Sequence, residues 1–190
     1  MVDSALLTAE QFAETRFDLP DSGRWTELVR GRIATLAPPE PEHGTVVLNL
    51  SKELASYLQR DRVGYACFEL GLILARSPDT VRYPPMSLFL GSTDFSETDK
   101  EITDKRPALV VEIASSPVRR RTIGDRVQEF LGWGIRQAWV IDPLEKTVDV
   151  LAIRKARQHL TSTESLEGGD LLPGFGMNVG DLFAEPSWWK

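Results

Sequence analysis

Cysteine and histidine are scarce in this chain of 190 residues, which holds one cysteine, Cys67, and two histidines. A single cysteine excludes an internal disulfide and any zinc site made of several cysteines. No uninterrupted apolar run approaches the roughly 20 residues that a membrane-spanning helix needs. The first residues show neither a basic segment nor a long apolar core of the kind found in a secretory signal, so we expect a cytoplasmic protein.

Basic residues are outnumbered, with 22 Lys and Arg against 28 Asp and Glu and a net charge of -6. This balance argues against a protein that holds nucleic acid by bulk electrostatics, although it leaves room for a local basic patch. Hydrophobic residues make up 42% of the chain and charged residues 26%, as in a folded globular protein. The length fits one domain, and no repeat or linker divides residues 1–190.

The segment 107–143 has the pattern and length of a βαβ unit, in which a helix connects two parallel strands. An apolar run over 108–114 predicts the first strand, 123–133 the helix, and 138–141 the second strand. Glu112 lies in the middle of the first run. A strand buried on both faces tolerates a carboxylate only where something binds it, which makes Glu112 a candidate functional residue.

The rest of the chain predicts a mixed α/β sheet with helices on its faces. Along the sequence we expect a short helix over 8–14, a hairpin over 24–34, an amphipathic helix over 43–60, and strands over 64–75, 80–90 and 147–153. Pro84 and Pro85 interrupt the strand over 80–90. Because proline donates no hydrogen bond to a sheet, this strand is expected at an edge or with a bulge.

Five fragments, in this order, resemble a bacterial family of restriction-endonuclease-like proteins within the PD-(D/E)XK nuclease superfamily. They are WTELVRGRI at 25–33, PPEPEH at 38–43, LVVEIASSP at 109–117, GIRQAWVIDP at 134–143 and LPGF at 172–175. The likeness holds over about residues 8–183. It implies a single α/β domain of the PD-(D/E)XK type, with a core sheet flanked by helices.

The resemblance also implies Mg²⁺-dependent cleavage of DNA, with the metal held by carboxylates on two adjacent strands. Position by position, the metal-binding and catalytic acids fall on Glu27 and Glu112, and the family's helical lysine falls on Arg126. Pro85 takes the place of the metal-binding aspartate and offers no side-chain ligand. Asp79, which also follows a proline, is an alternative ligand in a predicted turn.

This departure from the family's pattern leaves two functions open. One is a metal-dependent DNA endonuclease, and the other is a member that no longer cleaves and binds nucleic acid or a protein. Arg126 keeps a positive charge and suits a phosphate, but it stays protonated and cannot act as a base. Structural roles remain open too: Glu112 bound by Arg126 or backbone, Glu27 exposed opposite Arg32, and Arg126 paired with Glu129 or Asp125 on a solvated helix face.

Basic residues near these acids are candidates for contact with substrate phosphates, namely Arg119, Arg120 and His43. The run Arg119–Arg121 fits solvated surface equally well. At the other end of the chain, the adjacent Trp188 and Trp189 suggest a docking surface or a homodimer contact.

Overall fold

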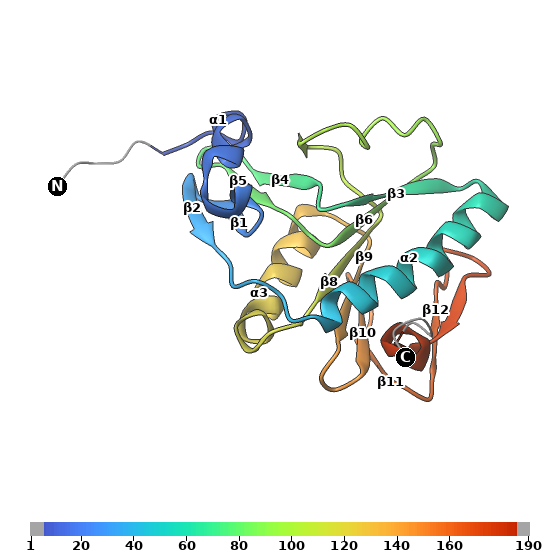
Figure 1. The fold of residues 1–190 in the computed structure, drawn as a ribbon. Coiled ribbons are helices and arrows are strands. Elements are labelled where there is room, and N and C mark those ends of the chain that lie inside the picture. Colours follow the sequence, from blue (N-terminus) through green and yellow to red (C-terminus); the bar gives the residue numbers. More distant parts are fainter. Residues whose placement is uncertain (1–5, 186–190) are drawn as a thin grey trace.

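The structure is a computed structural model that describes residues 6–185, and its mixed α/β domain is drawn in Figure 1. Its α-helices are α1 (Ala9–Thr15), α2 (Glu42–Asp61) and α3 (Pro117–Trp133). Short 3₁₀ helices are η1 (Arg16–Asp18), η2 (Pro20–Gly23) and η3 (Val179–Phe183). None of the helices within residues 6–185 combines the length and apolar character needed to cross a membrane.

The larger sheet has six strands in the order β11-β10-β9-β8-β6-β3. Their bounds are β3 (Gly64–Phe68), β6 (Met86–Leu90), β8 (Leu109–Ile113), β9 (Gln137–Asp142), β10 (Thr147–Ala152) and β11 (Gln158–Thr161). Strands β8 and β9 run parallel, and the other neighbours are antiparallel. The predicted βαβ unit is therefore confirmed.

The second sheet has five strands in the order β2-β1-β5-β4-β7. Their bounds are β1 (Thr26–Val29), β2 (Arg32–Thr35), β4 (Gly71–Ala75), β5 (Thr80–Arg82) and β7 (Ile102–Thr103), and a separate hairpin joins β12 (Ser165–Glu167) to β13 (Gly176–Asn178). The mixed α/β class is confirmed, but the strands that we expected in one mixed sheet are divided among these sheets.

The two adjacent prolines explain part of this division. We expected one strand over 80–90, yet the chain leaves the five-stranded sheet after Arg82 and joins the six-stranded sheet at Met86. Neither Pro84 nor Pro85 has an N–H to donate, so no ladder continues through them. The expected edge or bulge is thus a crossing between sheets, from β5, which pairs with β1, to β6, which pairs with β8.

Helix α3 begins at Pro117, six residues before the predicted start at 123. Ser116 caps it, since its hydroxyl accepts a hydrogen bond from the backbone N–H of Arg119 at 3.2 Å, and proline suits the first helical position. The helix ends at Gly134, whose φ of 106° favours glycine. The early start places the basic run inside the first turns of the helix.

The two long helices cover opposite faces of the six-stranded sheet (Figure 1). Helix α2 packs through residues such as Leu50 and Leu54 against a cluster that includes Trp139. Helix α3 packs Val127 and Phe130 against the other face, where Val110 lies. Side chains alternate along a strand, so Glu112 points to the same face as Val110 and meets α3.

Candidate functional site

Glu112 is buried on β8 and is bound by Arg126 from α3. The exposed fraction of Glu112 is 1%, and that of Arg126 is 7%. Arg126 donates from Nη2 to Glu112 Oε1 at 2.8 Å and from Nε to the same oxygen at 3.2 Å. The carboxylate that we singled out in the strand is therefore paired, as a buried charge must be.

Glu27 approaches the same arginine from the other sheet. It is fully buried on β1, and its Oε2 accepts from Arg126 Nη1 at 2.6 Å and from Arg82 Nη1 at 2.8 Å. Its Oε1 accepts from the backbone N–H of Tyr83 at 3.0 Å. The expectation that metal ligands come from two adjacent strands does not fit this chain, because β1 and β8 belong to different sheets.

Two of the structural alternatives are wrong. Glu27 is not an exposed partner of Arg32, since Ala34 lies opposite Glu27 in the hairpin and Val29 lies opposite Arg32. Arg126 is not on a solvated helix face, because its position on α3 points inward between the two sheets. The third alternative, Glu112 bound by Arg126, is the arrangement observed.

Arg82 and Glu129 complete a carboxylate–arginine cluster whose five members are Glu27, Arg82, Glu112, Arg126 and Glu129. Arg82 binds Glu129 with two hydrogen bonds, Nε to Oε2 at 2.8 Å and Nη2 to Oε1 at 2.9 Å. Sequence reasoning missed Arg82. The available signal was a charged residue in a strand that ends in a double proline, the same kind of signal that singled out Glu112.

Opposite charges keep Glu27 and Arg126 ionised despite their burial. Burial by itself would raise the pKa of Glu27, but the charges and hydrogen bonds of Arg126 and Arg82 hold that pKa below its ordinary value. Burial would likewise lower the pKa of Arg126, and the two glutamates hold it above its ordinary value instead. Both groups are therefore charged at neutral pH.

The residues present do not fit a magnesium ion. Mg²⁺ needs oxygen ligands in near-octahedral geometry, and here both converging carboxylates are bound by a guanidinium that repels a cation. Pro85, where the sequence resemblance places an aspartate, lines a small cavity together with Glu27, and proline has no side-chain oxygen to bind a metal. Within residues 6–185, no three His, Cys, Asp or Glu side chains converge as a metal site.

Asp79 serves a different part of the fold. Its carboxylate accepts from the backbone N–H groups of Ala9 at 2.8 Å and Ser77 at 3.0 Å, and Arg76 donates to it at 3.0 Å. Asp79 thus fastens α1 to the turn between β4 and β5. It makes no hydrogen bond to the carboxylate–arginine cluster.

The three residues predicted to bind substrate, Arg119, Arg120 and His43, lie in two different places. Arg120 is held by Asp142 through two hydrogen bonds of 2.7 Å, which gives it a structural partner at the end of β9. Arg119 and His43 line the small cavity that also contains Glu27 and Pro85. His43 Nδ1 lies 3.2 Å from Ser115 Oγ. Two of the three basic residues thus lie beside the carboxylate–arginine cluster.

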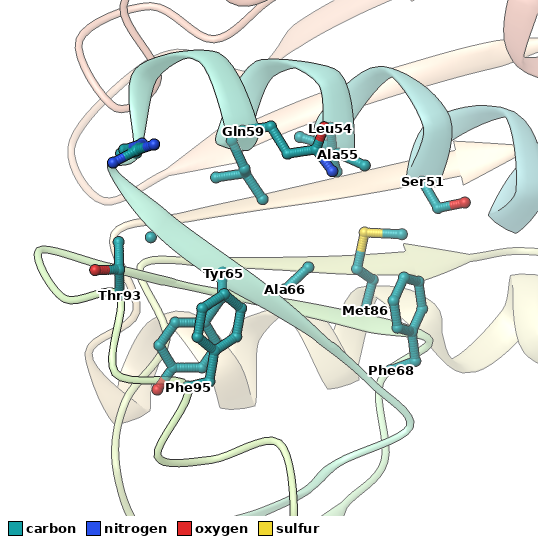
Figure 2. Close-up of a pocket in the computed structure, with 13 residues that line it drawn as sticks. Ser51, Leu54, Ala55, Gln59, Tyr65, Ala66, Phe68, Met86, Thr93 and Phe95 are labelled. Carbon is teal, nitrogen blue, oxygen red and sulfur yellow. The ribbon is translucent and has the colours of Figure 1, made fainter.

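A larger cavity, of about 640 Å³, lies beside the open edge strand β3 (Figure 2). Figure 2 shows Ser51, Leu54 and Gln59 projecting from α2 towards a groove that the aromatic rings of Phe68 and Phe95 flank. The lining includes no carboxylate and no histidine. This groove therefore offers no carboxylate or imidazole ligand for a metal ion.

The fold is that of a nuclease-like α/β domain. A solved structure from Anabaena variabilis ATCC 29413, titled a "putative nuclease belonging to DUF820", matches it with a TM-score of 0.74 and 21% identity. The match covers 93% of this chain and 97% of that chain. The profile of the Uma2 family, described as "Putative restriction endonuclease", matches residues 10–180, and the chain belongs to that family. No curated protein sequence matches the chain.

His43 is expected to make the fold sensitive to mild acid. Burial, followed by the charges of Arg119 and Arg24, lowers the pKa of His43 from 6.5 to about 4. Between pH 6.5 and 4, His43 is protonated in the unfolded chain but stays neutral in the folded chain. The free energy of unfolding therefore has its full value above pH 6.5 and decreases as the pH falls towards 4. A pKa difference of this size corresponds to at most about 3 kcal/mol.

Urea unfolding of the wild type and of His43→Gln at several pH values between 4 and 6.5 measures how the free energy of unfolding depends on pH. The loss of stability should be smaller in His43→Gln by about 3 kcal/mol or less. His159→Gln, which changes an exposed histidine bound to Asp149, is the matched control and should follow the wild type. Parallel curves for wild type and His43→Gln would contradict the expectation.

Proposed function

We propose that this chain binds nucleic acid on its nuclease-family fold and does not cut it by metal-dependent hydrolysis. The observation that carries the proposal is the guanidinium of Arg126, which bonds to Glu27 and Glu112 at 2.6 and 2.8 Å. Membership of a family described as restriction endonucleases supports nucleic acid as the ligand. Fold alone does not fix the reaction, so the argument rests on these side chains.

A divalent cation in this class of enzyme activates the attacking water and neutralises charge that develops on the phosphate. Arg126 supplies positive charge at the corresponding carboxylates but neither generates a nucleophile nor accepts a proton. Expelling it to admit a metal would leave a buried guanidinium without its partners. A metal-dependent endonuclease, the other function that the sequence leaves open, requires that displacement.

We expect binding of DNA without cleavage, and two assays measure these properties separately. Anisotropy of a fluorescent DNA duplex should report salt-sensitive binding with a dissociation constant on the order of 1–100 µM, the usual range for non-specific contacts. Mg²⁺ should not strengthen binding over that in EDTA at matched ionic strength, because no metal bridges protein and phosphate. Supercoiled plasmid incubated with the protein in Mg²⁺ or Mn²⁺ should remain intact.

Nicking that disappears in Glu112→Ala would overturn the proposal in favour of a metal-dependent nuclease. Failure to bind any duplex or single strand would overturn its nucleic-acid part. The homodimer expected from Trp188 and Trp189 stays a prediction, because both residues lie outside the described range 6–185.

A further inference from the structure

Arg119 is a half-buried arginine whose side chain forms no ion pair with the described residues 6–185. It occupies the third position of α3, where its backbone N–H bonds to Ser116, yet its buried side-chain Nε has no hydrogen-bond partner within residues 6–185. No carboxylate of the described chain forms an ion pair with it, unlike Arg120 and Arg126. Buried polar groups are nearly always satisfied, so this guanidinium marks a place for an acceptor.

Positive charge gathers around the same point. The cavity of about 20 Å³ is lined by Arg16, Arg24 and Arg119, with His43 beside them. Its carboxylates are Glu27, already bound by two arginines, and Glu69, which is exposed and forms no ion pair in the described chain. Burial and the charges of Arg119 and Arg24 lower the pKa of His43. Burial also lowers the pKa of Arg119, although the charges of Glu112, Glu27 and Glu69 oppose that shift.

Helix α3 adds to this potential. Arg119 stands in its first turn, which contains no acidic residue to offset the partial positive charge of the helix N-terminus. Ser115, just before the helix, places its hydroxyl within 3.2 Å of His43. Hydroxyl, imidazole and guanidinium groups at a helix N-terminus form a suitable environment for an oxyanion.

The size of the cavity restricts the ligand. Its volume of about 20 Å³ accommodates one or two oxygen atoms, since a water molecule needs about 10–15 Å³ on this measure. Trp25, Leu36 and Pro85 form apolar walls. Arg24 is exposed at the rim, with its guanidinium 5.0 Å from the ring centre of Trp25, and its long side chain can turn towards an entering group. One or two oxygens of an anionic group can enter the enclosed part, while the rest of the group would lie at the rim beside Arg24.

We propose that Arg119, Arg24 and His43 form a pocket for one terminal phosphate group, supplied by the end of a nucleic acid or by a free nucleotide. The inference rests on the proposed function for the nucleic-acid source and on the pocket alone for the phosphate. Arg126 is thus bound within the protein by Glu27 and Glu112, whereas the nearby Arg119 can bind a ligand.

The test follows the two histidine side chains by NMR while inorganic phosphate is added. Phosphate in the pocket should shift the His43 resonances in a saturable manner and raise the pKa of His43 by about one unit or more, because a nearby anion favours the imidazolium. His159 lies on β11 and bonds to Asp149, so its resonances should not move. Unchanged His43 resonances at saturating phosphate would overturn the pocket.

Two variants and one control locate the ligand. Arg119→Ala and Arg24→Ala should each weaken phosphate binding about tenfold, the size of a lost charge-assisted hydrogen bond. Arg121→Ala, an exposed neighbour on the same helix, should bind as the wild type does. Arg24 is exposed, so its variant is expected to fold even if Arg119→Ala does not. Equal affinity in Arg24→Ala and wild type would contradict the assignment.

Oligonucleotides then distinguish the sources. A single strand with a 5′-phosphate should bind about tenfold more tightly than the same strand with a 5′-hydroxyl, and Arg24→Ala should abolish the difference. Equal binding of both strands would refute the terminal-phosphate pocket while leaving nucleic-acid binding intact. Phosphate binding without binding of any oligonucleotide would refute the proposed function and assign the pocket to free nucleotides or phosphate.

Discussion

Arg126→Ala is expected to lower the free energy of unfolding by about 3–5 kcal/mol, the cost of removing one partner from a buried ion pair. The substitution removes the ion-pair partner of Glu112, whose exposed fraction is 1%, and leaves the fully buried Glu27 with Arg82 alone. For a chain of this length each kcal/mol corresponds to roughly 2–4 °C in Tm. Urea unfolding and a thermal melt at neutral pH measure both quantities, and Arg121→Ala is the exposed control.

The same variant should recover stability in acid. Without Arg126, burial disfavours the charged form of the Glu112 carboxylate, whereas Arg82 still binds Glu27 at 2.8 Å. A group with a raised folded pKa stabilises the fold below its unfolded pKa and loses that contribution as the pH rises. The difference in the free energy of unfolding between Arg126→Ala and the wild type should therefore decrease as the pH falls towards 4.5. A loss under about 1 kcal/mol, independent of pH, would contradict the account.

Pro85→Asp combined with Arg126→Lys is expected to restore binding of divalent metal. The first change returns a carboxylate to the position that lines the cavity with Glu27, and the second replaces the planar fork between the glutamates with a smaller, movable ammonium. At a Mn²⁺ concentration of about 100 times the dissociation constant, a bound metal would raise stability by about 2.7 kcal/mol. The wild type should show no such gain.

Pro85→Asn with Arg126→Lys is the matched control for that experiment. It makes the same change in backbone and size but adds no charge, so it should not gain stability in Mn²⁺. Equal responses of the two double variants would show that the carboxylate at position 85 does not bind the metal.

The βαβ unit was predictable because its signals are local. Apolar runs of strand length around a helical segment identify β8, α3 and β9, and the charge inside β8 marked Glu112 as a residue that needs a partner. Candidate residues followed from matching motifs along the sequence. These inferences depend only on residues that are close together in the sequence.

The assembly of the cluster was not predictable from the same signals. Glu27 and Arg126 are 99 residues apart, and nothing in a four-residue strand distinguishes a buried glutamate from an exposed one. From Pro84 and Pro85 we expect an edge strand or a bulge, whereas the chain passes there from one sheet to the other. Arg82, at the end of β5, bonds to Glu27. Long-range packing decided both outcomes.

Calorimetric titration of the wild-type protein with Mn²⁺ tests most directly the claim that Arg126 takes the place of a metal ion at Glu27 and Glu112. The account predicts no saturable heat in the wild type, in Glu112→Ala or in Arg121→Ala. Saturable binding by the wild type that is lost in Glu112→Ala would contradict it, because the carboxylates would then be accessible to metal despite Arg126.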